Sequence, residues 1–294
     1  MNVLEEGVLL LCCRLGDKNI KPLTLSRFKE LGLRVLGSLV GGNHLTELCP
    51  SDLCRMGYSR AEAEHIISLL DRQTQLEQYL AEGEALGIRA ITRVSDDYPG
   101  RITKKQAASR PPALFVMGDA ALLKKPAVSV VGSRDLHEAN VRFAETAGRL
   151  AAEEGYVLIS GGARGADTAA QEACLAAGGS CIIFMADRLD TYTPRENVLY
   201  VSEDGYDLSF SAARALHRNG LIHMMGEKTL AAQCTYGKGG TWQGCTENLK
   251  HGWSDLFVYE DGSEAMAALI DLGATGIDPL TSLHTLQNMQ TSLF

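Results

Sequence analysis

Apolar residues recur at spacings of three and four along the first ninety positions, which is the pattern of amphipathic helices. The stretches with this pattern are residues 4–15, 24–40 and 59–87. Ser59 is followed three residues later by Glu62, a pairing typical of a capping box at a helix start. The sequence therefore predicts a small helical N-terminal domain over residues 1–90.

The pattern changes after a polar segment punctuated by Pro99, Gly100, Pro111 and Pro112, where we place a domain boundary. Short apolar runs rich in β-branched residues then alternate with helical stretches. These runs cover residues 127–132, 156–161, 180–186, 198–203, 230–235 and 255–260. Such alternation predicts an α/β fold over residues 91–278, a Rossmann-like, doubly wound and mostly parallel sheet with helices on both faces. Residues 279–294 form a polar C-terminal tail.

Composition narrows the class of protein. The 294 residues include 45% hydrophobic ones, which suffices for a substantial core, and carry a formal net charge of -8. No run of about 18 apolar residues and no basic leader is present, so we expect a cytoplasmic protein without a membrane span. The eight cysteines lack metal-site spacing, and we predict no metal and no cofactor. A nucleic-acid site on this chain must be a local basic patch.

Three glycine-rich turns follow predicted strands and precede predicted helices. In a doubly wound sheet, ligands bind where strands end and helices begin, and glycine lets backbone N–H groups face an anion at a helix N-terminus. Arg134, Arg164 and Lys238 place one cation in each turn, and Ser133 and Thr241 add hydroxyl donors. This pattern predicts a phosphate site, although each turn taken alone is equally well explained by glycine serving turn geometry.

Four sequence stretches, in this order, resemble the DNA-processing protein A (DprA/Smf) family. They are PPALFVMGD, AVSVVGSR, SGGARGADTAAQEACLAAGGSCIIFMADRLDTYTPREN and RALHRNGLIHMMGEKTLAAQCTYGKGGTWQGCTENL. The resemblance spans about Tyr98 to Gly276. It implies a Rossmann-like domain that binds single-stranded DNA, forms a homodimer and helps load a strand-exchange recombinase of the RecA type in natural transformation or DNA recombination.

Matched position by position, the family motifs assign phosphate- or DNA-facing roles to a set of residues in and near the turns. They are Gly132, Ser133, Arg134, Gly161, Gly162, Arg164, Gly165, Asp167, Arg218, Asn219, Lys238, Gly239, Gly240 and Thr241. For Arg218 and Asn219, bracing the loops is an equal alternative. For Asp167, capping the following helix is the favoured role. The sequence departs from the family pattern at Gln171, where histidine is usual, and at Ala166, where isoleucine is usual.

Other features have two interpretations each. Trp242 and Tyr192 could stack on bases, but packing is the favoured role for both. The C-terminal residues Gln290, Leu293 and Phe294 resemble the peptide with which bacterial proteins bind the replication sliding clamp, while packing of the tail on its own domain is the favoured alternative.

Two other functions compete with DNA binding. A nucleotide hydrolase that cleaves the N-glycosidic bond would use a glutamate such as Glu247 beside the glycine turn, although GGTWQGCTE differs in spacing from that motif. A sensor that binds a small nucleotide would use the same turns. No Ser-His-Asp or Cys-His set follows from the spacing, so we name no catalytic residue and expect a protein that is not an enzyme.

Overall fold

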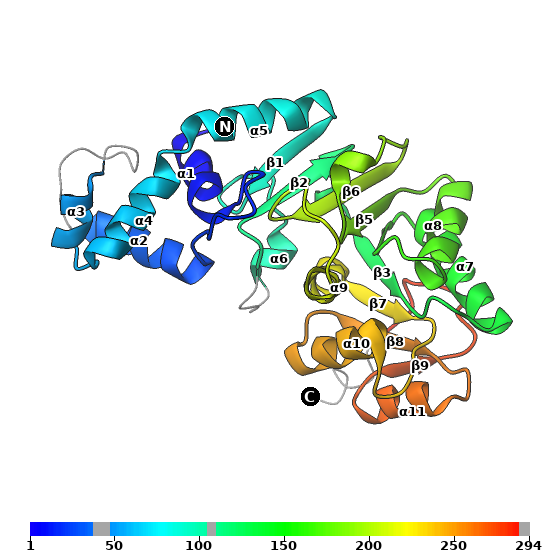
Figure 1. Ribbon diagram of the computed structural model, residues 1–294. Coiled ribbons are helices and arrows are strands. Elements are labelled where there is room, and N and C mark those ends of the chain that lie inside the picture. The colour runs from blue at the N-terminus through cyan, green and yellow to red at the C-terminus, as the bar shows by residue number, and fades with distance from the viewer. Residues whose placement is uncertain (38–47, 105–109, 288–294) are drawn as a thin grey trace.

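Helices form in all three predicted stretches of the N-terminal part, but the stretch 59–87 is divided into two helices, and residues 50–55 add a short helix that was not expected. The structure is a computed structural model that describes residues 1–37, 48–104 and 110–287 (Figure 1). Within these ranges the first helices are α1 (Val3–Cys12), α2 (Leu25–Gly37), α3 (Pro50–Arg55), α4 (Arg60–Leu70) and α5 (Gln73–Ala85). Helix α4 begins at the predicted capping box, in which the N–H of Ser59 donates to the Glu62 carboxylate and the N–H of Glu62 donates to Ser59 Oγ. Apolar residues of α1, α2, α3 and α4 form a shared core.

A single sheet organises the rest of the chain. Its strand order is β1-β2-β6-β5-β4-β3-β7-β8-β9. The strands are β1 (Ile88–Thr92), β2 (Ala113–Met117), β3 (Ala127–Val131), β4 (Val157–Ser160), β5 (Cys181–Met185), β6 (Val198–Glu203), β7 (Lys228–Ala231), β8 (Asp255–Tyr259) and β9 (Thr275–Ile277). The pairs β1–β2 and β2–β6 are antiparallel, and all other pairs are parallel. The predicted Rossmann-like, mostly parallel sheet is confirmed.

The strand order reverses beside β3. From β3 the chain steps outward through β4, β5 and β6, and then returns to β7 on the other side of β3. The loops that leave the carboxyl ends of β3 and β7 therefore diverge. In doubly wound sheets this point of reversal is where a ligand finds a crevice.

Helices cover both faces of the sheet, as Figure 1 shows. Alternate residues of β3 face opposite sides: Val128 and Val130 pack with α7 (Glu138–Glu153) and α8 (Ala166–Ala176), and Ala127 and Val131 pack on the other side. The helices that contribute to this second core are α6 (Gly100–Lys104), α9 (Ala212–Met225), α10 (Gly239–His251) and α11 (Glu264–Asp271). Single 3₁₀ turns cover Ala120–Lys124 and Leu189–Thr191.

Four strands differ from the prediction. Strand β7 ends at Ala231, whereas the expected strand covered residues 230–235. The carbonyl of Ala232 accepts a hydrogen bond from Asn140 Nδ2 at 2.7 Å, so the chain leaves the ladder there. Strands β1, β2 and β9 were not expected. Strands β1 and β2 flank the proline-containing segment taken as a domain boundary, and β9 has only three residues.

One apolar core joins the N-terminal helices to the sheet. Leu9 of α1 and Leu76 of α5 belong to the same buried cluster as Phe115 of β2. The ring of Tyr79, on α5, stacks on Tyr206 with 4.2 Å between centroids. At the other end of the chain, Leu280 and Leu283 join this cluster. The division into units at residues 90/91 and 278/279 stays a prediction.

The described residues contain no candidate transmembrane helix. None of those helices combines the length and the apolar content that a bilayer crossing requires.

Candidate phosphate-binding site

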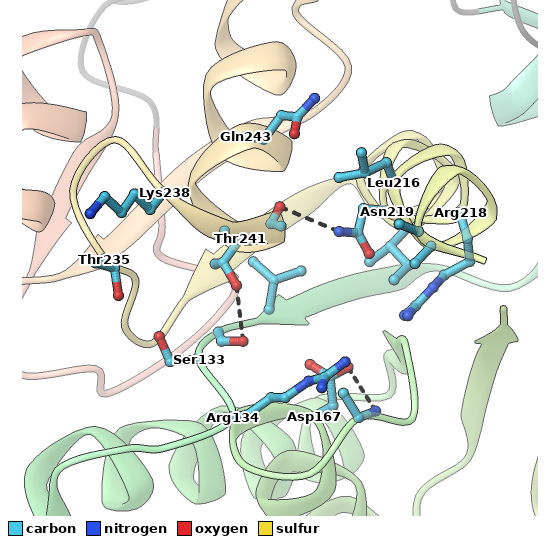
Figure 2. A pocket seen from close by; sticks show the side chains of 18 of the residues that line it. Ser133, Arg134, Asp167, Leu216, Arg218, Asn219, Thr235, Lys238, Thr241 and Gln243 are labelled. Carbon is cyan, nitrogen blue, oxygen red and sulfur yellow. Dashed lines mark hydrogen bonds between the residues drawn. The ribbon is translucent and has the colours of Figure 1, made fainter. Parts of the chain in front are cut away.

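A pocket of about 540 Å³ opens where the strand order reverses, beyond the carboxyl ends of β3 and β7 and between α9 and α10 (Figure 2). We call it the switch-point pocket. The residues of the predicted site that line it are Gly132, Ser133, Arg134, Asp167, Arg218, Asn219, Lys238, Gly239, Gly240 and Thr241. The structure thus brings the first and third glycine turns and α9 together. Gly161, Gly162, Arg164 and Gly165 of the second turn are not among its lining residues.

The first turn, Gly132 to Arg134, is tied to the third by hydrogen bonds. The N–H of Ser133 donates to the carbonyl of Gln233 at 2.9 Å, and Ser133 Oγ donates to the same carbonyl at 3.3 Å. Thr241 Oγ1 donates to the carbonyl of Gly132 at 3.0 Å, as Figure 2 shows. The two hydroxyls predicted as ligand donors therefore brace the loops in this structure. Arg134 is exposed at the pocket.

In the second glycine turn, backbone amides donate to a side chain of the protein itself. Asp167 Oδ2 accepts from the N–H of Gly161 at 3.0 Å and from the N–H of Ala163 at 3.2 Å. The prediction that Asp167 caps the following helix is wrong, because α8 has Gly165 as its N-cap and Asp167 is already a helical residue. The carboxylate instead satisfies the amides of the preceding turn. Those N–H groups, which the sequence assigned to a phosphate, have an internal acceptor.

Arg218 lies deep in the same wall of the pocket. Only 9% of the residue is exposed, and its Nη1 lies so close to Gly161 that a Cβ at that position would be 1.3 Å away. Glycine is therefore required there for Arg218 to reach the turn. Burial raises the pKa of Asp167 and lowers the pKa of Arg218, while the attraction between the two charges opposes both shifts. Arg218 Nε is buried without a hydrogen-bond partner among the described residues.

Arg164 points to the surface beside the pocket. Its Nη2 donates to Asp135 Oδ1 at 2.9 Å, and both side chains are largely exposed. The expectation that Arg134, Arg164 and Lys238 share one pocket holds for Arg134 and Lys238 only. The next residue, Gly165, has φ +86° and packs so tightly on the first turn that a Cβ there would lie 2.4 Å from the carbonyl oxygen of Ser133.

The third turn leaves a helix N-terminus open toward the pocket. Helix α10 begins at Gly239, its N-cap is Lys238, and no side chain of the described residues caps it. The first N–H groups of a helix have no partner within it, and the helix dipole adds partial positive charge at that end. Asn219 Nδ2 donates to the carbonyl of Gly240 at 3.3 Å and so holds the turn in place. For Asn219 this contact supports the bracing role.

The electrostatics of the pocket oppose those of the whole molecule. Its lining contains three permanent cations, Arg134, Arg218 and Lys238, and a single carboxylate, Asp167. The chain as a whole carries -8. Figure 2 shows Arg218 above Arg134 and Asp167, with Lys238 on the opposite loop. Together with the open α10 N-terminus, these charges suit a ligand that carries phosphate.

Several lining residues escaped the sequence analysis. Phe210 lies at the pocket and is 58% exposed, and Leu216 beside it is 41% exposed. Phe210 precedes Ser211, the N-cap of α9, which is a signal that could have placed it at a loop end near the site. His223 is buried in the pocket wall, and burial lowers its pKa to about 4, so it is neutral at pH 7.

Both aromatic candidates are packing residues, as favoured. Trp242 contacts the core of the sheet and meets Tyr236 edge-on, with 4.9 Å between ring centroids. Tyr192 packs against Tyr200 and donates to Asp187. Neither is among the residues that line the switch-point pocket.

Glu247, on which the hydrolase alternative depends, is also not a lining residue of this pocket. Its carboxylate pairs with Lys250 at 3.5 Å and with His251 at 3.1 Å along α10. In the described ranges no group of three or more His, Cys, Asp and Glu side chains could hold a metal ion. Gln290, Leu293 and Phe294, the clamp-binding candidates, lie outside the described residues.

Comparison with known proteins gives relatives for most of the chain. The sequence matches the family DNA recombination-mediator protein A over residues 89–286, more than half of its 294 residues. The DNA processing protein DprA of Streptococcus pneumoniae is 32% identical over 128 residues, which are 44% of this chain and 44% of that protein. The alignment thus spans less than half the length of this relative.

Two solved structures are similar to this one. The X-ray structure of DNA processing protein A from Streptococcus pneumoniae has a TM-score of 0.68 at 24% identity and covers 94% of this chain and 95% of that chain, which shows a common fold. The structure of DNA processing protein A from Helicobacter pylori, described as binding single-stranded DNA, has a TM-score of 0.55 at 25% identity and covers 65% of this chain and 91% of that chain.

Proposed function

The chain belongs to the DNA recombination-mediator protein A family, and on this premise we propose that it binds single-stranded DNA in the switch-point pocket. One observation carries the proposal: Arg134, Arg218, Lys238 and the uncapped N-terminus of α10 converge on one pocket where the strand order reverses. The Helicobacter pylori relative, described as binding single-stranded DNA, supports the same ligand.

A strand in this pocket would place a phosphate against the first amides of α10. Backbone N–H groups and the helix dipole favour a negative group there, and they carry no preference for base sequence. Arg134 and Lys238, both exposed, would pair with neighbouring phosphates. Phe210 at the pocket offers a face on which a base can stack, a sequence-tolerant contact of about 1–3 kcal/mol.

The acidic net charge is compatible with this ligand. Duplex coating requires a broad basic surface, whereas a single strand in one pocket requires only local cations. The three cations and one carboxylate of the lining supply that local excess. We therefore expect tight binding to be limited to a few nucleotides and to depend strongly on salt.

The test is a titration of fluorescent oligo(dT) at several salt concentrations. A DNA binder shows an affinity that falls linearly with the logarithm of salt concentration, by about 0.7 per phosphate contact for a single strand. A nucleotide sensor would instead gain thermal stability from one mononucleotide and ignore the oligonucleotide. A hydrolase would release free base from a monophosphate. Either of these results in place of oligonucleotide binding would contradict the proposal.

The family supports a role in natural transformation or DNA recombination. We propose that this chain acts as a homodimer that helps load a RecA-type recombinase on the bound strand, without itself being an enzyme. The measurement is recombinase filament formation on oligo(dT) with and without the protein. A protein that binds the strand but slows filament formation would contradict the loading role while leaving DNA binding intact.

The C-terminal residues Gln290, Leu293 and Phe294 are the basis of a separate partner proposal, the replication sliding clamp. Deletion of residues 290–294 should abolish recovery of the clamp in a pull-down and leave oligonucleotide binding unchanged. Recovery of equal amounts of clamp with the shortened chain would rule out this peptide as the contact.

A further inference from the structure

A second pocket, of about 690 Å³, lies beyond the carboxyl end of β6, where the N-terminal helices meet the sheet. We call it the junction pocket. Its walls come from the α1–α2 connection, the residues before β2, and the opening of α9. The charged residues of its lining are Arg14, Lys18, Arg110, Asp204 and Arg214. Pro111, Pro112, Arg214 and His217 belong to the stretches that resemble the family, but no residue of this pocket has a role in the proposed function.

The junction pocket is as cationic as the switch-point pocket. Arg14, Lys18, Arg110 and Arg214 line it beside one carboxylate, that of Asp204. Arg214 is committed to the fold, since its guanidinium donates to the carbonyls of Leu208 and Ala186 and to a serine hydroxyl. Within the described residues, Arg14, Lys18 and Arg110 form no ion pair shorter than 4 Å. An acidic protein thus has an excess of positive over negative side chains in a second cavity.

Asp204 gives the pocket a second kind of chemistry. Its Oδ1 is buried and has no hydrogen-bond partner in the described part of the chain. The residue has φ +64°, a conformation that side chains other than glycine rarely adopt and that recurs at binding sites. Burial and the neighbouring charge of Glu203 raise the pKa of Asp204 to about 7. A buried carboxyl oxygen without a donor costs free energy that a ligand N–H or O–H would recover.

We propose that the junction pocket binds a nucleotide, with its phosphate toward Arg14, Lys18 and Arg110 and with an N–H or O–H of its base or sugar donating to Asp204. The volume lies within the range of about 300–1,000 Å³ typical of small-molecule sites. Leu23, Leu25 and Leu208 supply apolar wall for a base. A bare inorganic anion would use the cations but leave the carboxyl oxygen unsatisfied.

The two pockets share a wall. Ala212, Ala215 and Leu216 of α9 line the switch-point pocket, while Ser211, Arg214 and His217 line the junction pocket. The nucleotide therefore has two possible sources: a free nucleotide, or a further residue of a strand that already occupies the switch-point pocket. The second source rests on the proposed function. Both have the same recognition chemistry, and the experiment separates them.

The decisive variant is Lys18→Glu/Arg110→Glu. Its matched control is Lys29→Glu/Lys125→Glu, which makes the same change of charge at two exposed lysines that line neither pocket. All measurements are made also in an Arg134→Ala/Lys238→Ala background, in which the switch-point pocket is weakened. The probes are deoxyguanosine monophosphate, whose base offers two N–H donors, and oligo(dT) of 6 and 20 nucleotides. Calorimetric titration gives the affinities.

If the pocket binds a free nucleotide, deoxyguanosine monophosphate binds in the Arg134→Ala/Lys238→Ala background. Lys18→Glu/Arg110→Glu then weakens this binding at least tenfold, while the control variant does not. If the pocket instead binds a further residue of a bound strand, the variant weakens the affinity for the 20-mer at least threefold and leaves the affinity for the 6-mer unchanged. If the variant shows neither of these effects, or if the control shows an equal effect, the proposed junction site is overturned. Oligonucleotide binding that is insensitive to Arg134→Ala/Lys238→Ala would overturn the proposed function instead, so the two failures are distinct.

Thermal melting verifies that each variant folds. If the charge reversal prevents folding, Lys18→Gln/Arg110→Gln removes the same cations without adding acid, and the same tenfold and threefold criteria apply to it.

Discussion

The second and third glycine turns look alike in sequence and differ in what their amides do. Both follow a buried strand and both precede a helix at the same edge of the sheet. In the second, the carboxylate of Asp167 accepts from the N–H groups of Gly161 and Ala163. In the third, Lys238 precedes α10 and no described side chain caps it. The second turn is thus filled from within by the Asp167 carboxylate, whereas no described side chain accepts from the first amides of α10.

The largest expected effect follows removal of the internal acceptor. Asp167→Ala leaves two amides without a partner and Arg218 buried without its opposite charge, so we expect a loss of about 2–4 kcal/mol of unfolding free energy. Urea unfolding measures it. Asp167→Asn, which keeps an oxygen acceptor, should lose clearly less. Equal stability of Asp167→Ala and the wild type would show that the second turn does not depend on this carboxylate.

The open turn should respond in binding and not in stability. Arg134→Ala/Lys238→Ala removes two exposed cations of the pocket, so oligo(dT) affinity should fall about tenfold or more and the salt slope should drop by about 1.4. The unfolding free energy should stay within about 0.5 kcal/mol of wild type, as for other surface substitutions. A matching loss of stability and binding would mean that these side chains hold the loops together.

The turn after β6 contains a carboxylate, that of Asp204, whose buried oxygen has no hydrogen-bond donor among the described residues. The pKa of Asp204 is raised to about 7, so between about pH 4 and pH 7 the folded protein keeps a proton that the unfolded chain releases. Stability from this residue therefore falls as pH rises through that window. Asp204→Asn should raise the unfolding free energy by about 1 kcal/mol or more at pH 8, with the gain vanishing toward pH 4. A gain that is the same at both pH values would contradict the shift.

The smallest effect is expected at Arg164. Its guanidinium pairs with Asp135 in solvent and does not line the switch-point pocket. Exposed ion pairs contribute about 0–1 kcal/mol, so Arg164→Ala should change stability little and oligo(dT) affinity less than threefold. Arg134→Ala alone is the matched comparison in the same binding assay. A larger loss from Arg164→Ala than from Arg134→Ala would place the DNA on the other side of the first turn.

The sheet could be predicted from the sequence because its central strands are continuous apolar runs separated by helical periodicity. The fully buried β3 and β5 are examples. Strands β1, β2 and β9 could not be predicted, because β1 and β2 flank the proline-containing segment taken as a domain boundary and β9 has only three residues. Strand β7 was displaced because Asn140, 92 residues away from Ala232, takes the carbonyl that would have extended the ladder.

At the site, the glycine turns could be predicted from the sequence, but the partners of their hydrogen bonds could not. Thr241 and Ser133 were expected to contact a ligand, yet both hydroxyls donate to carbonyls of neighbouring loops. Phe210 was missed because an isolated aromatic in a polar loop has no periodic signal. The junction pocket could not be predicted from the sequence, because Arg110 and Asp204 come together only through the pairing of β2 with β6.

Phosphate binding in the switch-point pocket depends on free amides at the start of α10, and ¹⁵N-glycine labelling observes these amides directly. With 30 glycines in the chain, a two-dimensional amide spectrum is resolvable and assignable by single substitutions. On titration with oligo(dT), we expect large chemical-shift changes for the amides of Gly239 and Gly240 and little change for Gly161, whose N–H donates to Asp167. Shifts at Gly161 with Gly239 and Gly240 unmoved would contradict this expectation.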